Sequence, residues 1–81
     1  MERSKEELKY LGRWGKEIRE NRKYMQNQLA EETGISLTSL SRFERGEQAI
    51  NLIFFLELLV VLNVTDQEYL RLKEGLKDLK K

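Results

Sequence analysis

The stretch from residue 26 to residue 45, QNQLAEETGISLTSLSRFER, constrains the fold more than any other part of this 81-residue sequence. Its pattern predicts two short helices, over residues 26–33 and 37–45, with Gly34 between them. Glycine adopts positive φ without steric cost, so Gly34 supplies the backbone freedom that a tight turn needs. Helices joined so closely must cross at a steep angle, and the small Ala30 stands where they meet.

The apolar residues of this stretch fall where such a crossing pair needs a core. They are Leu29, Ile35, Leu40 and Phe43. Together with Ala30 and Gly34 they make six positions in register over 15 residues. That spacing describes a helix-turn-helix, whose second helix lies in the major groove of DNA.

The composition predicts an all-α protein, a compact bundle of about five helices. The chain has no proline and is rich in Leu, Glu, Lys and Arg, which favour helices. Three further helices are expected over residues 5–23, 52–62 and 65–81. Their start signals are capping residues, and these are Ser4 with Glu7, Asn51, and Thr65 with Glu68.

We expect one domain over residues 1–81, with a core at 14–64 and a C-terminal helix at 65–81 that serves dimerisation. Gly12 and Gly15 weaken the first predicted helix. A break near them would leave residues 1–13 as a separate leading arm, and the sequence leaves this alternative open.

The residue types that are missing argue against an enzyme. The chain has no cysteine and no histidine, which removes disulfides, thiolate zinc sites and the commonest general base. No nucleophile has a base beside it. We therefore expect no catalytic residue, cofactor, metal or small-molecule substrate. The longest apolar run, residues 52–62, is shorter than the roughly 20 residues of a membrane span, and the charged N-terminus is unlike a signal peptide. The prediction is a cytoplasmic protein without membrane contact.

Net charge gives only weak support to nucleic-acid binding, because it is +1. Residues 1–25 carry eight Lys and Arg against five Glu, whereas the remainder carries seven basic against nine acidic residues. A DNA-facing surface would therefore be a local basic patch on the molecule.

The segment WGKEIRENRKYMQNQLAEETGISLTSLSRFERGE resembles the phage-repressor family (Cro-like, or XRE) of helix-turn-helix domains. The resemblance covers residues 14–70 and implies a lambda-repressor-like DNA-binding fold in a bacterial or phage-encoded protein. The segment SRFERGEQAINL, with Asn63 and Tyr69, also resembles the N-terminal domains of Rgg/MutR-type regulators of Gram-positive bacteria. Those regulators continue into a large helical-repeat domain that is absent here.

The resemblance implies roles for six residues in binding double-stranded DNA. Gln26 matches a glutamine that anchors a backbone phosphate and braces the recognition helix. Positions that face base edges are occupied by Leu37, Thr38 and Arg42. Ser36, which is also the expected N-cap of its helix, and Ser39 lie nearer the sugar-phosphate backbone.

The resemblance also implies a structural pair. Arg19 and Glu44 match an arginine and a glutamate that form a partly buried ion pair between the first and third helices. Met25 departs from the family, which has Ser or Thr there, so the second helix is expected to lack its ordinary N-cap. Arg22 and Lys23 lie nearest the expected DNA edge and are candidates for phosphate contacts.

The chemistry of the 37–45 helix agrees with these roles. Thr38 and Arg42 are four residues apart and share one face, opposite Leu40 and Phe43. An arginine offers two parallel donors to O6 and N7 of guanine, and apolar groups such as Leu37 and the Thr38 methyl contact the methyl of thymine. Neutral Ser, Thr and Gln side chains hold phosphates without adding charge.

Residues 52–62 are more apolar than one buried stripe requires. The expected core stripe consists of residues 52, 55, 56, 59 and 62, which leaves Ile53, Phe54 and Val60 pointing elsewhere. Further along, a three-four-three spacing typical of a helix-pair seam is formed by Tyr69, Leu72, Leu76 and Leu79. Either the last helix folds back over this surface within one chain, or the surface joins two chains. We favour the second interpretation and expect a homodimer.

The sequence thus predicts a DNA-binding transcriptional regulator, a homodimer that acts as a repressor. Two alternatives stay open. One is an antitoxin-like or other protein-interaction module that uses the fourth and fifth helices, and the other is the N-terminal DNA-binding fragment of a larger regulator. The initiating methionine and the terminal lysines favour a complete small protein over a fragment.

Overall fold

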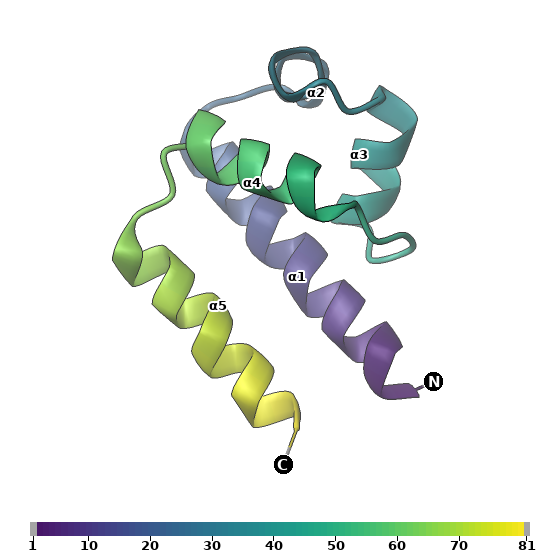
Figure 1. Cartoon of the computed structure of the whole chain (residues 1–81), viewed down its shortest axis with the longest axis vertical. Coiled ribbons are helices and arrows are strands. Elements are labelled where there is room, and N and C mark those ends of the chain that lie inside the picture. The colour runs from purple at the N-terminus through teal and green to yellow at the C-terminus, as the bar shows by residue number, and fades with distance from the viewer. Residues whose placement is uncertain (1, 81) are drawn as a thin grey trace.

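The computed structural model describes the backbone of residues 2–80 and the side chains of residues 5–80. This part of the chain forms five α-helices and no strand (Figure 1). They are α1 (Glu2–Asn21), α2 (Gln26–Thr33), α3 (Leu37–Glu44), α4 (Leu52–Val61) and α5 (Asp66–Leu79). The prediction of an all-α protein with about five helices is confirmed.

Local capping fixes where the helices start, as the sequence predicts. The Ser36 hydroxyl accepts from the Ser39 amide at 3.0 Å, and the Asn51 side chain accepts from the amide of Phe54 at 2.9 Å. At the start of α5 a reciprocal pair joins Thr65 and Glu68. Each such bond satisfies an amide that has no partner within its helix. The turn before α3 is made by Gly34 at φ 82°.

The first helix corrects two expectations. It begins at Glu2, so Ser4 lies inside the first turn instead of at the N-cap, and the Ser4 side chain lies outside the described residues. It also continues through both glycines, so within the described residues the segment 2–13 is not set apart as an arm. A Cβ at Gly12 would overlap the carbonyl oxygen of Phe43 and lie 3.0 Å from that of Glu44. Gly12 therefore lets the backbones of α1 and α3 touch.

The last helix folds back antiparallel along α1 (Figure 1). The Trp14 indole donates to the Glu68 carbonyl at 2.9 Å, and the Tyr10 hydroxyl donates to the Arg71 carbonyl at 3.1 Å. Leu72 is buried in the core. Partly buried Leu76 packs against the same core, so half of the predicted seam is used within one chain.

The core lies where α1, α2, α3 and α4 converge, with Leu72 added from α5. Its buried apolar members are Trp14, Ile18, Leu29, Ala30, Ile35, Leu40, Phe43, Leu58, Leu62 and Leu72. The four apolar positions predicted for the helix-turn-helix core are all among them.

The buried side of α4 differs from the predicted stripe. Leu52 is 68% exposed and Leu56 is 46% exposed, although both were expected in the core. Leu58 is buried instead, and Phe54, expected to point outward, packs partly against the core. The expectation that Ile53 and Val60 point outward is confirmed. A helix that is apolar on nearly every side has no polar face to fix its rotation about its own axis. Packing against the rest of the fold therefore determines that rotation.

Arg22 ties the start of α5 to the end of α1. Its guanidinium makes two hydrogen bonds of 2.6 Å with the Glu68 carboxylate, and it also donates to the carbonyls of Leu62 and Asn63. Four of the five guanidinium N–H donors of Arg22 are occupied inside the fold, so the structure gives its expected phosphate contact no support. The same hydrogen bonds lower the pKa of Glu68 from 4.5 to about 2.

We expect this pair to contribute to stability in acid. A carboxylate whose folded pKa lies below its unfolded value stabilises the protein fully above about pH 4.5, and this contribution is lost as the pH falls towards 2. The Glu68 side chain is 16% exposed, so solvent screening reduces the effect to about 2 kcal/mol. Urea denaturation of the wild type and of Glu68→Gln at pH 7, 4.5 and 2.5 measures it. The difference between the two proteins should shrink with decreasing pH, and a constant difference would contradict the assignment.

Candidate nucleic-acid interface

The second helix of the predicted pair presents a polar face with an apolar tip to solvent. Leu37, Thr38 and Arg42 are exposed, while Leu40 and Phe43 on the opposite side are each 1% exposed. This burial fixes the rotation of α3 and so fixes which side chains point outward. The structure therefore brings together the three residues expected at base edges.

Leu37 and Arg42 on this face present an apolar surface and hydrogen-bond donors that the described part of the fold does not use. Leu37 remains 49% exposed at the first turn, which is a large apolar surface to leave in water. Among the described residues, the Arg42 guanidinium makes no hydrogen bond or ion pair. An unpaired arginine on a fixed helix face can offer its two parallel donors to an acceptor outside the protein.

The two serines differ in their surroundings. Ser36 is exposed at the N-terminus of α3, where its hydroxyl serves as the N-cap. Ser39 is only partly exposed and lies on the flank of α3, where its hydroxyl accepts from the Gln48 amide at 3.3 Å. Ser39 therefore faces the segment after α3 and stands apart from the face of Thr38 and Arg42.

A buried ionic network holds α3 against α1 and α2. Arg19 and Glu44 are 8% and 7% exposed, and their side chains pair through two hydrogen bonds of 2.7 and 3.0 Å. Arg19 also donates to the carbonyl of Tyr24 at 2.7 Å. The Gln26 amide donates to Glu44 at 2.7 Å. The expected ion pair is present, and Gln26 contacts the recognition helix directly.

Comparison with known families agrees with this geometry. A family model described as helix-turn-helix matches residues 16–69, which is about two thirds of the chain and includes α2, the turn and α3. The chain belongs to the helix-turn-helix family of Cro and lambda repressor. A search of curated proteins gave no match. As a member of this family, the chain contains a DNA-binding transcription-regulator domain.

The helix-turn-helix starts without a side-chain cap. Met25 occupies the N-cap position of α2 and makes no side-chain hydrogen bond to the first turn. Its own amide donates to the Gln28 side chain over a long 3.4 Å. The departure of Met25 from the family pattern thus leaves α2 held by its packing on α3 and α4 and by the Gln26 contact.

Sequence reasoning missed Arg45, which follows the last turn of the recognition helix. Its guanidinium donates to the Ser41 hydroxyl at 2.7 Å and pairs with the Glu47 carboxylate at 3.0 Å. This hydrogen bonding lowers the pKa of Glu47. The spacing of four residues to Ser41 and two to Glu47 is a local signal that could have revealed this cluster.

Within residues 2–80 no helix has the length and apolar character to cross a membrane. In the same part of the chain, no three metal-ligating side chains of Asp, Glu, His or Cys gather in one place.

Proposed function

We propose that the helix-turn-helix domain binds duplex DNA sequence-specifically as a homodimer and represses transcription by occupying a promoter in the cytoplasm. The observation that carries the proposal is the exposed Arg42 beside Thr38, on a helix whose opposite side is buried. Among the described residues its guanidinium makes no hydrogen bond or ion pair, and it is attracted to Glu47 only over a longer distance. A recognition helix needs this combination, because base readout depends on a fixed register in the major groove.

The proposed contacts divide into two classes. Arg42 donates to O6 and N7 of a guanine, and Leu37 and the Thr38 methyl contact a thymine methyl. Phosphates are held at the ends of α2 and α3 by neutral donors, which are proposed to be Gln26, Ser36 and Ser39. One amide hydrogen of Gln26 is used by Glu44, and the second is available to a phosphate.

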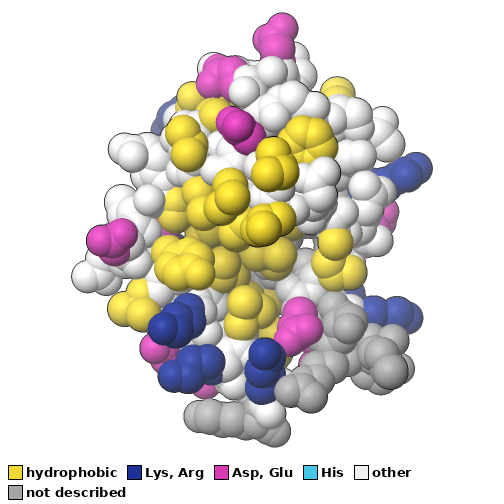
Figure 2. All heavy atoms as spheres, viewed as in Figure 1, with side chains coloured by type: hydrophobic (Ala, Val, Ile, Leu, Met, Phe, Trp, Pro, Cys, Tyr) yellow, Lys and Arg dark blue, Asp and Glu magenta, His cyan; other side chains and the backbone are white. Residues whose placement is uncertain are grey.

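The α4 surface supports the homodimer. Figure 2 shows hydrophobic side chains gathered over the side of the molecule where α4 lies. The exposed apolar residues of this α4 surface are Leu52, Ile53, Leu56 and Val60. Four such side chains in one stripe are more than a monomer ordinarily leaves in water. A two-fold axis beside α4 would present two copies of α3 to half-sites about 34 Å apart.

Arg42→Ala tests the base contact. Loss of a bidentate contact to guanine should weaken binding to a selected operator by about 1–3 kcal/mol and relax the preference at one base pair. The midpoint of thermal unfolding should change little, since Arg42 is exposed and makes no hydrogen bond or ion pair among the described residues. The operator is found by selection from random DNA, and affinity is measured by fluorescence anisotropy at fixed salt. Lys16→Ala, which removes an equal charge from exposed α1, is the control. If both variants lost the same amount of binding free energy, Arg42 would contribute only its positive charge and no base-specific contact.

Val60→Glu tests the dimer. Val60 is 76% exposed, so the substitution should leave the fold intact while burying a charge in the proposed interface. Analytical ultracentrifugation should show a dimer for the wild type at high micromolar concentration and a monomer for the variant, with much weaker binding to a full operator. A wild type that is a monomer without DNA would contradict the proposal. That result would favour the antitoxin-like alternative, in which α4 contacts a different protein.

A further inference from the structure

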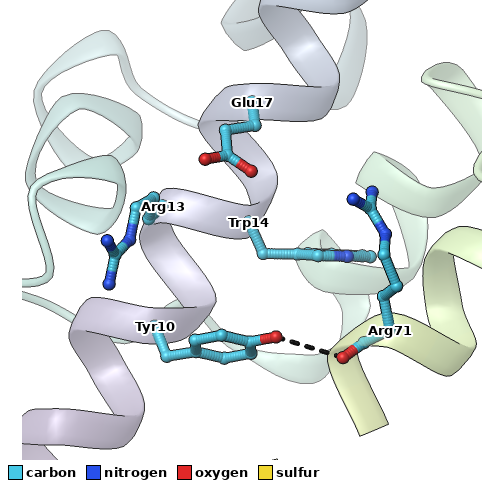
Figure 3. Close-up of a pocket in the computed structure, with 5 residues that line it drawn as sticks. All are labelled: Tyr10, Arg13, Trp14, Glu17 and Arg71. Carbon is cyan, nitrogen blue, oxygen red and sulfur yellow. Dashed lines mark hydrogen bonds between the residues drawn. The ribbon is translucent and has the colours of Figure 1, made fainter. Parts of the chain in front are cut away.

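A cleft between α1 and α5 is not used by the proposed DNA-binding function. Its volume is about 260 Å³, and it is lined by Tyr10, Arg13, Trp14, Glu17 and Arg71 (Figure 3). Sites for drug-sized ligands have volumes of roughly 300–1,000 Å³. The cleft therefore suits a smaller molecule, of about the size of an amino acid.

The aromatic floor of the cleft is held in place from both helices. The Trp14 indole nitrogen donates to the Glu68 carbonyl at 2.9 Å, and the Tyr10 hydroxyl donates to the Arg71 carbonyl at 3.1 Å. Both rings come from α1, and both acceptors are backbone atoms of α5. Because the rings are already oriented, a ligand that lies on them would lose little free energy in ordering the site.

Opposite charges stand on the two sides of this floor. In Figure 3 the Glu17 carboxylate and the Arg71 guanidinium lie on the same side of the Trp14 ring and face one another across the space beside it. Within the described residues they form no ion pair with each other or with any other side chain. Arg13 also lines the cleft, but its guanidinium points away from Trp14.

We propose that this cleft binds the zwitterion of a free α-amino acid with an apolar side chain. The ammonium group would pair with Glu17, the carboxylate would accept two hydrogen bonds from Arg71, and the side chain would pack on the Tyr10 ring and the small exposed part of the Trp14 ring, which is 7% exposed. A simple anion would be repelled by Glu17, and a simple cation would be repelled by Arg71. A zwitterion satisfies both charges at once.

Trp14 makes the test direct, because it is the only tryptophan in the chain and belongs to the cleft. The full chain is titrated with L-leucine, L-methionine and L-phenylalanine. Binding is followed by the indole N–H resonance and, for leucine and methionine, by fluorescence. We expect saturable binding by at least one of them, with a dissociation constant of about 1 mM or tighter. N-acetylation or amidation of that amino acid should weaken binding about tenfold, because each removes one charged contact.

Three variants test which charged residues of the cleft contact the amino acid. Glu17→Gln and Arg71→Gln should each weaken binding at least about fivefold, whereas Arg13→Gln should leave it nearly unchanged. All three positions are exposed, so far-ultraviolet circular dichroism should confirm that the fold is retained. Two results would overturn the proposal: no saturable change up to about 20 mM of all three amino acids, or equal binding of the capped and free forms. Neither result depends on whether the protein binds DNA.

Discussion

Glu44→Ala should destabilise the protein by about 3–5 kcal/mol, because it leaves the buried Arg19 guanidinium without its carboxylate. Domains usually have a free energy of unfolding of only about 5–15 kcal/mol. A small domain lies near the lower end, so a large share of the variant molecules should be unfolded at 37 °C. Urea denaturation at 25 °C measures the loss. Glu47→Ala, which removes a carboxylate from an exposed pair with Arg45, is the matched control and should cost less than about 1 kcal/mol.

A double variant separates the penalty of a stranded charge from the value of the pair itself. Replacing Arg19 by Met and Glu44 by Leu removes both buried charges and should recover much of the stability lost in Glu44→Ala. Gln26 would lose its acceptor in this variant, so recovery should be incomplete. A loss below about 1 kcal/mol in the single variant would show that the network contributes little to the fold.

Gly12→Ala should cost about 3 kcal/mol, although alanine favours a helix over glycine by about 1 kcal/mol. The new Cβ would overlap the carbonyl oxygen of Phe43, and a backbone atom cannot move aside as a flexible side chain can. The helices α1 and α3 must then separate, which also displaces the recognition helix. Both the free energy of unfolding and the affinity for the operator should therefore decrease.

Gly15→Ala is the control for this prediction. It lies one turn further along α1, and a Cβ there would be 3.2 Å from the edge of the Phe43 ring, which can shift slightly. Its cost should be well below that of Gly12→Ala. An increase in stability for Gly12→Ala would mean that helix propensity outweighs packing and that α1 and α3 do not approach so closely.

The site was predictable from the sequence where local signals define it. Ser36 caps α3, Gly34 takes the positive φ of the turn, and the spacing of Leu40 and Phe43 sets the rotation of the helix. These signals act over three or four residues and need no knowledge of the rest of the fold. The exposure of Thr38 and Arg42 follows from them.

Other features depend on contacts between residues far apart in the chain. Arg22 resembled a surface charge but is tied to Glu68, 46 positions away. Gly12 resembled a helix breaker, yet it is the point where α1 touches α3. Neither role leaves a local pattern, because it depends on which helix packs alongside.

By itself the sequence determined the helical class, most helix boundaries to within one residue and the outward face of α3, since capping, turns and amphipathic spacing are short-range effects. Both ends of α1 and the end of α5 differ by two or three residues from the expected bounds. Only the tertiary structure decided how α4 is rotated and where α5 packs. The α4 segment is apolar on most sides, so several rotations bury similar area. Packing of α4 on α2 and of Phe55 beside Trp14 accompanies the rotation that buries Leu58 and exposes Leu52. The apolar seam of α5 (Tyr69, Leu72, Leu76 and Leu79) could pack against a second chain or against its own chain equally well. Hydrogen bonds from Trp14 and Tyr10 placed it against α1.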